Sequence, residues 1–324
     1  MGKLKGVLVT VLAVVIGLPI AAVGGIAAYD SIRFSDYYKN AEKLHKIPGI
    51  HDDYIPQGLA YSETYNVYLN CGYMHDDSAS RIYITNESDD STKYVSLKYN
   101  GELFKKHTGG ITVYGEKAYI SNSKKLYVLS MSDLVNASNG DYVNIESEQK
   151  VHTNSSFCFA TDTMMYVGEY YDGNKYTTDE THYVKNGEQE SHAFILAYPI
   201  ILDIVSPLPI AGYAIPNNAQ GMCVTDSGKI VISTSCGINP SKLLSYKTNS
   251  NTYITTYKND DLLLPIPISF LGENELVNEI TCPPMNEEIM YKDGYVYINN
   301  ESACNKYIFG KFTKAKYIYR IKID

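Results

Sequence analysis

Five polar residues stand out as able to take part in chemistry, because each lies at the opening of one of five similar segments. They are Gln57, His107, Ser156, Gln220 and Glu287. If the five segments surround one axis, these side chains gather in one place. Amides, a hydroxyl, an imidazole and a carboxylate brought together would suit the binding of a polar ligand.

Two more polar residues, Asn70 and Glu169, lie where the second strands of their segments are expected to end. Together with Glu287 they offer oxygen ligands of the kind that calcium prefers. A carboxylate in an otherwise uncharged channel is costly unless it is paired or bound to a metal. The alternative is that the polar side chains only satisfy neighbouring backbone groups. The sequence contains no GxSxG or HExxH motif, so it assigns no catalytic residue.

Each segment has the pattern of a β-hairpin followed by a third strand. The segments start at residues 57, 109, 156, 220 and 287, and their turns contain residues such as Asp226-Ser227-Gly228 and Asp293-Gly294. Asp and Gly are preferred in tight hairpin turns. Repeats of about 40 to 50 residues are typical of four-stranded propeller blades, and longer intervals leave room for loop insertions.

The repeats predict an all-β protein, a β-propeller spanning residues 45–324. Five blades are expected, with six as the alternative if residues 249–283 contain a degenerate copy. The last copy has three strands before the chain ends, so residues 45–50 are expected to supply its outer strand. Closure by the two ends of the chain would remove exposed sheet edges.

The first 29 residues predict a signal-anchor or transmembrane helix. After Lys3 and Lys5, an uncharged run extends from residue 6 to residue 29, which is long enough to cross a bilayer. The two lysines place the amino terminus in the cytoplasm, with a juxtamembrane stalk at residues 30–44 and the C-terminal domain outside the membrane. Cleavage after the run is the alternative, and would make the protein secreted.

The composition excludes one class of partner. The chain has 28 Lys and Arg against 36 Asp and Glu, a net charge of −8. An acidic protein is a poor partner for a phosphate backbone, so nucleic-acid binding is not expected. The 31 tyrosines suit strands and contacts with protein or glycan ligands.

The segment openings resemble those of known propellers. Pro56-Gln57-Gly58-Leu59-Ala60, Ala219-Gln220-Gly221-Met222 and the hairpin Lys292–Val296 are similar to blade openings of gluconolactonase-like (senescence-marker) and strictosidine-synthase-like propellers. The whole also resembles membrane-anchored bacterial propellers. In the lactonases a metal-binding Glu precedes the Gly of the first blade, whereas this chain has Gln57.

Three functions follow as hypotheses. The first is a membrane-anchored binding or scaffolding propeller for protein or glycan ligands. The second, implied by the resemblance, is a metal-assisted lactone or ester hydrolase at the central funnel, with calcium as the metal. The third is a glycosidase that uses Glu169 and Glu287 as its two carboxylates.

Overall fold

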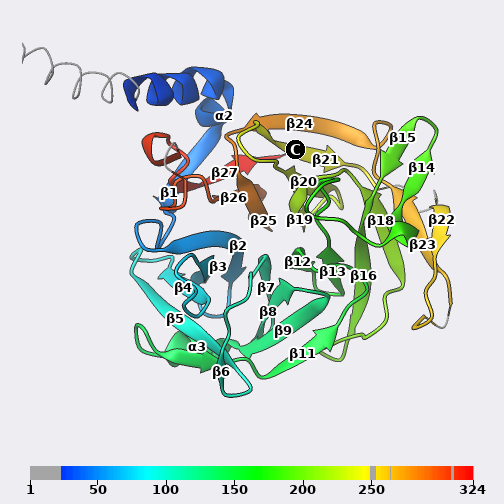
Figure 1. The fold of residues 1–324 in the computed structure, drawn as a ribbon, viewed down its shortest axis with the longest axis horizontal. Coiled ribbons are helices and arrows are strands. Elements are labelled where there is room, and N and C mark those ends of the chain that lie inside the picture. The colour runs from blue at the N-terminus through cyan, green and yellow to red at the C-terminus, as the bar shows by residue number, and fades with distance from the viewer. Residues whose placement is uncertain (1–22, 249–252, 263, 308–309, 324) are drawn as a thin grey trace, which may run out of the picture.

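The protein is a ring of β-sheets arranged around a central axis (Figure 1). Its structure is a computed structural model that describes residues 23–248, 253–262, 264–307 and 310–323. Within these residues, five sheets have four or more strands, and one two-stranded ribbon is separate from them.

The five innermost strands form a closed ring. They are β2 (Tyr54–Ser62), β7 (Gly110–Tyr114), β12 (Phe157–Ala160), β19 (Ala219–Val224) and β25 (Asn286–Lys292). Contacts run from β2 through β7, β12 and β19 to β25, and from β25 back to β2 (Figure 1). The predicted all-β propeller is therefore confirmed.

Each innermost strand is the first of four strands that pair antiparallel in order. The second strands are β3 (Val67–Met74), β8 (Lys117–Asn122), β13 (Met164–Gly168), β20 (Ile230–Thr234) and β26 (Tyr295–Asn300). The third strands are β4 (Arg81–Asn86), β9 (Lys125–Ser130), β16 (Ala193–Ile201), β21 (Ser241–Tyr246) and β27 (Tyr317–Lys322). The outer strands are β5 (Thr92–Tyr99), β11 (Ser147–Lys150), β18 (Ala211–Ile215), β24 (Leu276–Cys282) and β1 (Ala41–Lys46).

The remaining elements lie outside the five sets of four strands. They are β6 (Glu102–Leu103), β10 (Tyr142–Asn144), β17 (Ile204–Val205), β22 (Tyr253–Tyr257), β23 (Ile266–Phe270), the β14–β15 ribbon (Val184–Asn186 and Gln189–Ser191), the α-helices α2 (Ser35–Asn40) and α3 (Met131–Asn136), and the 3-10 helices Glu180–His182 and Gly310–Phe312. The β14–β15 ribbon belongs to the insertion at residues 171–191. Strands β22 and β23 belong to the insertion at residues 249–283 and extend the sheet that contains β18.

The hairpin turns have the backbone that their residues favour. Lys292 pairs with Tyr295 across a two-residue loop. Both loop residues have positive φ, 53° at Asp293 and 81° at Gly294. Two such residues form the type I′ turn that matches the twist of paired strands, and Asp-Gly is a preferred sequence for it. The turn chemistry in the sequence therefore predicts this hairpin correctly.

The hydrophobic core lies between neighbouring sheets. The cluster between the first two sheets contains fully buried side chains such as Leu69 and Ile120, and helix α3 packs against it with Leu134. The cluster between the last sheet and the first contains Leu59 and Tyr297. Because each sheet is covered by both of its neighbours, the stability of one sheet depends on the next.

The two ends of the chain meet in one sheet. Strand β1 pairs antiparallel with β27, joining Ala41 to Ile321 and Glu42 to Arg320. The expected closure is therefore present, although the closing strand is Ala41–Lys46 rather than residues 45–50. Residues of the predicted stalk also pack on the ring, since Phe34 and Tyr37 are buried in a core cluster with β27.

The predicted membrane segment lies largely outside the described residues. Its described part, residues 23–29, is helical, and the helix continues to residue 33 of the predicted stalk before α2 at the edge of the ring (Figure 1). In the part of the chain that the structure describes, no helix is both long and apolar enough to cross a membrane.

Candidate functional site

Three predicted site residues are positioned by β-bulges in innermost strands. The strand pairing skips Gln57 between Pro56 and Gly58 in β2. It skips Gln220 in the same way in β19, and it shifts across Glu287 and its neighbour in β25. A bulge leaves its residue unpaired and turns its side chain in a new direction, which is why bulges are common beside functional sites.

Glu301, which directly follows β26, joins this group. Its Oε2 accepts a hydrogen bond from Gln57 Nε2 at 2.9 Å, and its Oε1 accepts one from the Tyr307 hydroxyl at 3.0 Å. On the other side, Gln220 Nε2 lies 3.5 Å from Glu287 Oε1, a long contact. Two carboxyl groups thus lie in one cluster, each beside an amide.

A cation and two rings complete the group. Lys306 Nζ donates to the Tyr73 hydroxyl at 2.7 Å, and the Tyr73 ring lies 4.6 Å from the His107 ring, centre to centre. His107 and Lys306 are exposed, so solvent reaches the group from their side. We call Gln57, Tyr73, His107, Gln220, Glu287, Glu301, Lys306 and Tyr307 the rim cluster.

The carboxyl groups of the rim cluster are shifted toward their protonated forms. Burial raises the pKa of Glu287 well above its usual value, and the neighbouring Glu301 raises it further, against the opposing effect of Lys306. Burial also raises the pKa of Glu301. The two groups interact, so the charge left by the loss of the first proton makes the second proton harder to remove.

The imidazole of the rim cluster is shifted toward its neutral form. Desolvation, with a smaller contribution from the Lys306 charge, lowers the pKa of His107 to about 4. The ring is crowded by protein atoms although part of it remains open to solvent. A neutral His107 has one donor and one acceptor nitrogen, and a carboxyl group that keeps its proton adds a further donor.

Glu288, next to Glu287, points to the middle of the ring instead. It is 1% exposed, and its carboxyl group accepts hydrogen bonds from the backbone of three innermost strands. Oε2 accepts from Leu59 N at 3.0 Å and Ile111 N at 2.6 Å, and Oε1 accepts from Cys158 N at 3.1 Å. Glu288 therefore faces the interior of the ring and not solvent.

The glycines of the segment openings make room for Glu288. A Cβ atom on Gly58 would lie 2.9 Å from Glu288 Oε2, and one on Gly221 would lie 2.5 Å from its Cα. Gly110 is crowded by the same carboxyl group. The Gln-Gly pattern of the openings therefore has two causes: the amide reaches the rim cluster, and the glycine admits the central Glu288.

Glu169 has hydrogen-bond partners outside the rim cluster. It is fully buried, and its Oε1 lies 2.6 Å from His182 Nδ1 and accepts from Phe194 N at 3.0 Å. Its Oε2 accepts from Asn154 N at 3.0 Å. None of these hydrogen bonds joins Glu169 to Glu287, so among the described residues the bonding does not support the predicted pairing of the two carboxylates.

Ser156 and Asn70 have structural partners. Ser156 Oγ accepts from Tyr170 N at 3.0 Å. Asn70 Nδ2 donates to Gly58 O at 2.9 Å, and Asn70 Oδ1 accepts from the Tyr54 hydroxyl at 3.0 Å. These are the bonds expected of polar residues that satisfy nearby groups. The set Glu287, Glu169 and Asn70 does not fit a calcium ion, because the oxygens of Glu169 and Asn70 are already bonded.

Over the described ranges, no three His, Cys, Asp or Glu side chains are grouped as metal ligands. The structure does bring together Gln57, His107, Gln220 and Glu287. It adds four residues that the sequence analysis does not single out, Tyr73, Glu301, Lys306 and Tyr307. The one signal for them in the sequence is position, since Tyr73 is the last residue but one of the second strand β3 and Glu301 directly follows the second strand β26.

Comparisons with known proteins were made at three levels. Neither the models of protein families nor the curated proteins give a match. Among solved structures, the chain is similar to the PQQ-bound aldose sugar dehydrogenase of Streptomyces coelicolor, with 14% identity over 88% of this chain and 81% of that chain and a TM-score of 0.45. An oxidoreductase of the glucose dehydrogenase type from Thermus thermophilus has 12% identity over 87% and 99%, with a TM-score of 0.46.

A gluconolactonase-like protein is also among the similar structures. It has 9% identity over 87% of this chain and 91% of that chain, with a TM-score of 0.39.

Proposed function

We propose that the rim cluster binds a polyhydroxylated ligand, such as the end of a glycan chain, and that the protein is a binding module. The observation that carries this proposal is the coupled pair Glu287 and Glu301, each beside a glutamine amide and reachable from the side of exposed His107 and Lys306. Sugar hydroxyls both donate and accept, so they match a group that contains donors and acceptors.

The rings of the rim cluster support the same ligand class. Tyr73 and Tyr307 are half-buried, so each presents part of a ring next to a polar atom. A sugar has an apolar face of C–H groups that packs on an aromatic ring, while its hydroxyls reach the polar atoms beside it. A purely charged ligand would use only Lys306 or the carboxyl pair.

The test is a glycan array probed with the full chain, followed by calorimetry with the best ligand. Gln57→Ala and Glu287→Gln are each expected to weaken binding about tenfold, the loss expected for one or two buried hydrogen bonds. Glu146→Gln is the matched control, because Glu146 is an exposed acidic residue outside the rim cluster. Absence of any glycan ligand, or equal affinity in all variants, would contradict the proposal.

A second candidate is hydrolysis at the same cluster. It is favoured by the raised pKa values of Glu287 and Glu301. Glycosidic hydrolysis needs one protonated carboxyl group and one carboxylate, so the pair would be Glu287 and Glu301 rather than Glu287 and Glu169. Hydrolysis would be supported if the wild type releases nitrophenol from aryl glycosides or esters. Both Glu287→Gln and Glu301→Gln are then expected to lose this activity. A calcium titration shows whether a cation takes part.

Location and blade number are proposals as well. The lysines and the uncharged run of residues 3–29 favour an anchored domain outside the membrane. Protease added to intact cells is then expected to degrade it, and a soluble form lacking the run would instead indicate cleavage. The five innermost strands, each followed by three more in its sheet, favour five blades.

A further inference from the structure

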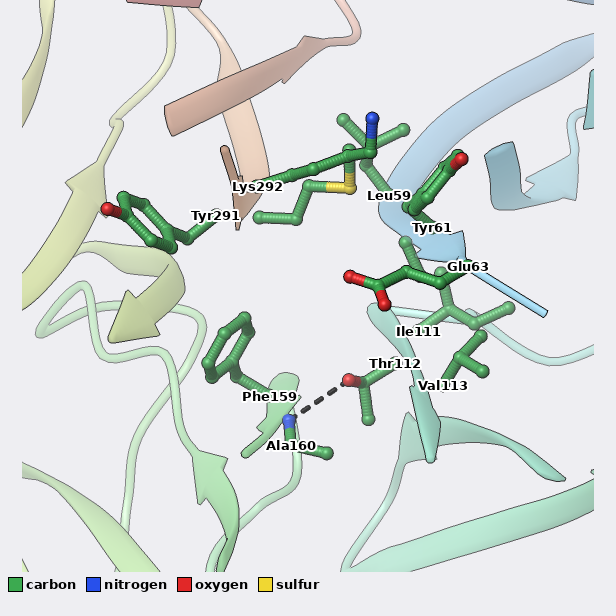
Figure 2. A pocket seen from close by; sticks show the side chains of 12 residues that line it. Leu59, Tyr61, Glu63, Ile111, Thr112, Val113, Phe159, Ala160, Tyr291 and Lys292 are labelled. Atoms are coloured by element: carbon green, nitrogen blue, oxygen red, sulfur yellow. Dashed lines mark hydrogen bonds between the residues drawn. The ribbon is translucent and has the colours of Figure 1, made fainter. Parts of the chain in front are cut away.

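A small pocket lies where the innermost strands end, at the opposite end of the ring from the rim cluster. It is about 110 Å³ in volume and is lined by the ends of β2, β7, β12 and β25 (Figure 2). Water occupies about 30 Å³ per molecule in the liquid. The pocket therefore holds a group the size of about four waters.

The walls of this pocket are aromatic and aliphatic. Leu59, Ile111 and Met290 are buried beneath it, while the rings of Phe159 and Tyr291 are half-exposed along its side. Half-exposed aromatic rings at a channel end keep apolar surface in contact with water, and a ligand that covers them gains free energy.

One carboxylate points into the pocket. Figure 2 shows Glu63 extending from the turn after β2 toward the space between Phe159 and Thr112. Within the described part of the chain, Glu63 has neither a hydrogen-bond partner nor an ion-pair partner. The Thr112 hydroxyl accepts one hydrogen bond, from Ala160 N at 3.0 Å, and retains a second lone pair.

The basic residue that lines the pocket, Lys292, is already paired with two carboxylates. Lys292 Nζ lies 2.9 Å from Glu87 Oε1 and 3.1 Å from Asp293 Oδ2, and it sits 4.3 Å above the Tyr61 ring. The ammonium of Lys292 thus shows within this chain how a cation sits over a ring at this surface. Because Lys292 is paired with Glu87 and Asp293, it does not neutralise the Glu63 carboxylate.

Acidic residues also surround the pocket. Each turn that follows an innermost strand contains one, so all five lie at this end of the ring: Glu63, Glu116, Asp162, Asp226 and Asp293. Their combined field attracts cations and repels anions.

We propose that this pocket binds the head group of an organic ammonium ion, in particular a trimethylammonium group. Aromatic faces attract such a cation, and the carboxylate of Glu63 balances its charge. An anion would face Glu63 directly, and a neutral apolar ligand would remove water from Glu63 without compensation. This site is independent of the ligand proposed for the rim cluster.

The test uses the full chain and tetramethylammonium as the probe, with binding followed by calorimetry. Binding is expected to weaken roughly fivefold or more in Glu63→Gln and also in Phe159→Leu. Glu116→Gln is the control, because it removes the same charge from the next hairpin turn. Glu116 does not line the pocket, and Gln keeps an oxygen that can accept the hydrogen bond from the Tyr65 hydroxyl. Neopentyl alcohol, a neutral compound of similar shape, is expected not to bind.

Three outcomes would overturn the proposal. They are no binding of tetramethylammonium, equal binding of the neutral alcohol, and equal loss in Glu63→Gln and Glu116→Gln. If tetramethylammonium does bind, co-sedimentation with phosphatidylcholine vesicles, compared with vesicles of an anionic lipid, shows whether the group is presented on a lipid or on a free molecule. Loss of co-sedimentation in Glu63→Gln assigns the lipid source.

Discussion

Glu288 Oε2 accepts a hydrogen bond of 2.6 Å from the backbone of Ile111, 177 residues earlier in the chain. The same carboxyl group binds Leu59 N and Cys158 N. One side chain therefore joins four of the five innermost strands, because it belongs to β25 and bonds to β2, β7 and β12. Burial raises the pKa of Glu288 well above its usual value, and the three N–H bonds act in the opposite direction.

Removing an acceptor from Glu288 is expected to destabilise the whole ring. Glu288→Gln keeps the shape but turns an amide N–H₂ toward at least one backbone N–H, leaving that donor unsatisfied. The expected loss is about 1 to 3 kcal/mol in the free energy of unfolding, measured by urea denaturation. Glu146→Gln is expected to change it by less than about 0.5 kcal/mol. Equal urea midpoints for the two variants would show that Glu288 is not needed.

The raised pKa of Glu287 predicts a pH effect on stability. A carboxyl group whose pKa is higher in the folded state binds its proton more tightly there. Its stabilising contribution is complete below the unfolded pKa of about 4.3 and is lost as the pH rises through the folded pKa. Above about pH 4.5, the wild type is thus expected to lose stability relative to Glu287→Gln, by at most about 1.4 kcal/mol per pH unit. A difference that stays constant with pH would contradict this.

The closing strand is expected to stabilise the entire ring. A chain that begins at residue 47 lacks β1, so β27 loses its outer partner and Arg320 loses its bond to Glu42, 2.8 Å from Nε to Oε2. We expect a loss of at least about 2 kcal/mol in unfolding free energy, from several ladder hydrogen bonds. A chain that begins at Tyr29 is the control, because it keeps β1 and the bond from Lys314 N to Asp30. If both chains melt at one temperature, β1 contributes nothing to the ring.

The buried pair of Glu169 and His182 is expected to hold the insertion at residues 171–191 in place. Glu169→Ala leaves His182 Nδ1 and the N–H groups of Asn154 and Phe194 without their acceptor. The expected cost is at least about 3 kcal/mol, because each buried donor left without its acceptor costs about 1 to 3 kcal/mol. The cost should be the same with excess calcium or with a chelator. If calcium raises the stability of the wild type but not that of Glu169→Ala, Glu169 has a metal-binding role after all.

Local features of the sequence are sufficient to predict the all-β propeller architecture. Hairpins such as the one at Asp293-Gly294 follow from turn residues and alternating side chains, which act over a few residues. The sequence also predicts that the two ends of the chain close the ring, because the last repeat lacks one strand and needs it from elsewhere. Only the exact closing strand, Ala41–Lys46, differed, since pairing with β27 is decided by packing of the whole sheet.

The roles of the acidic residues were decided by the tertiary structure alone. Glu287 and Glu288 are neighbours in sequence, yet a β-bulge sends one to the rim cluster and the other to the central axis. Glu301 and Gln57 meet across 244 residues. Sequence reasoning placed Gln57, His107, Gln220 and Glu287 in one region because they share a repeat position. It could not tell which carboxyl groups face each other, because that depends on bulges and on contacts between distant strands, which no local pattern records.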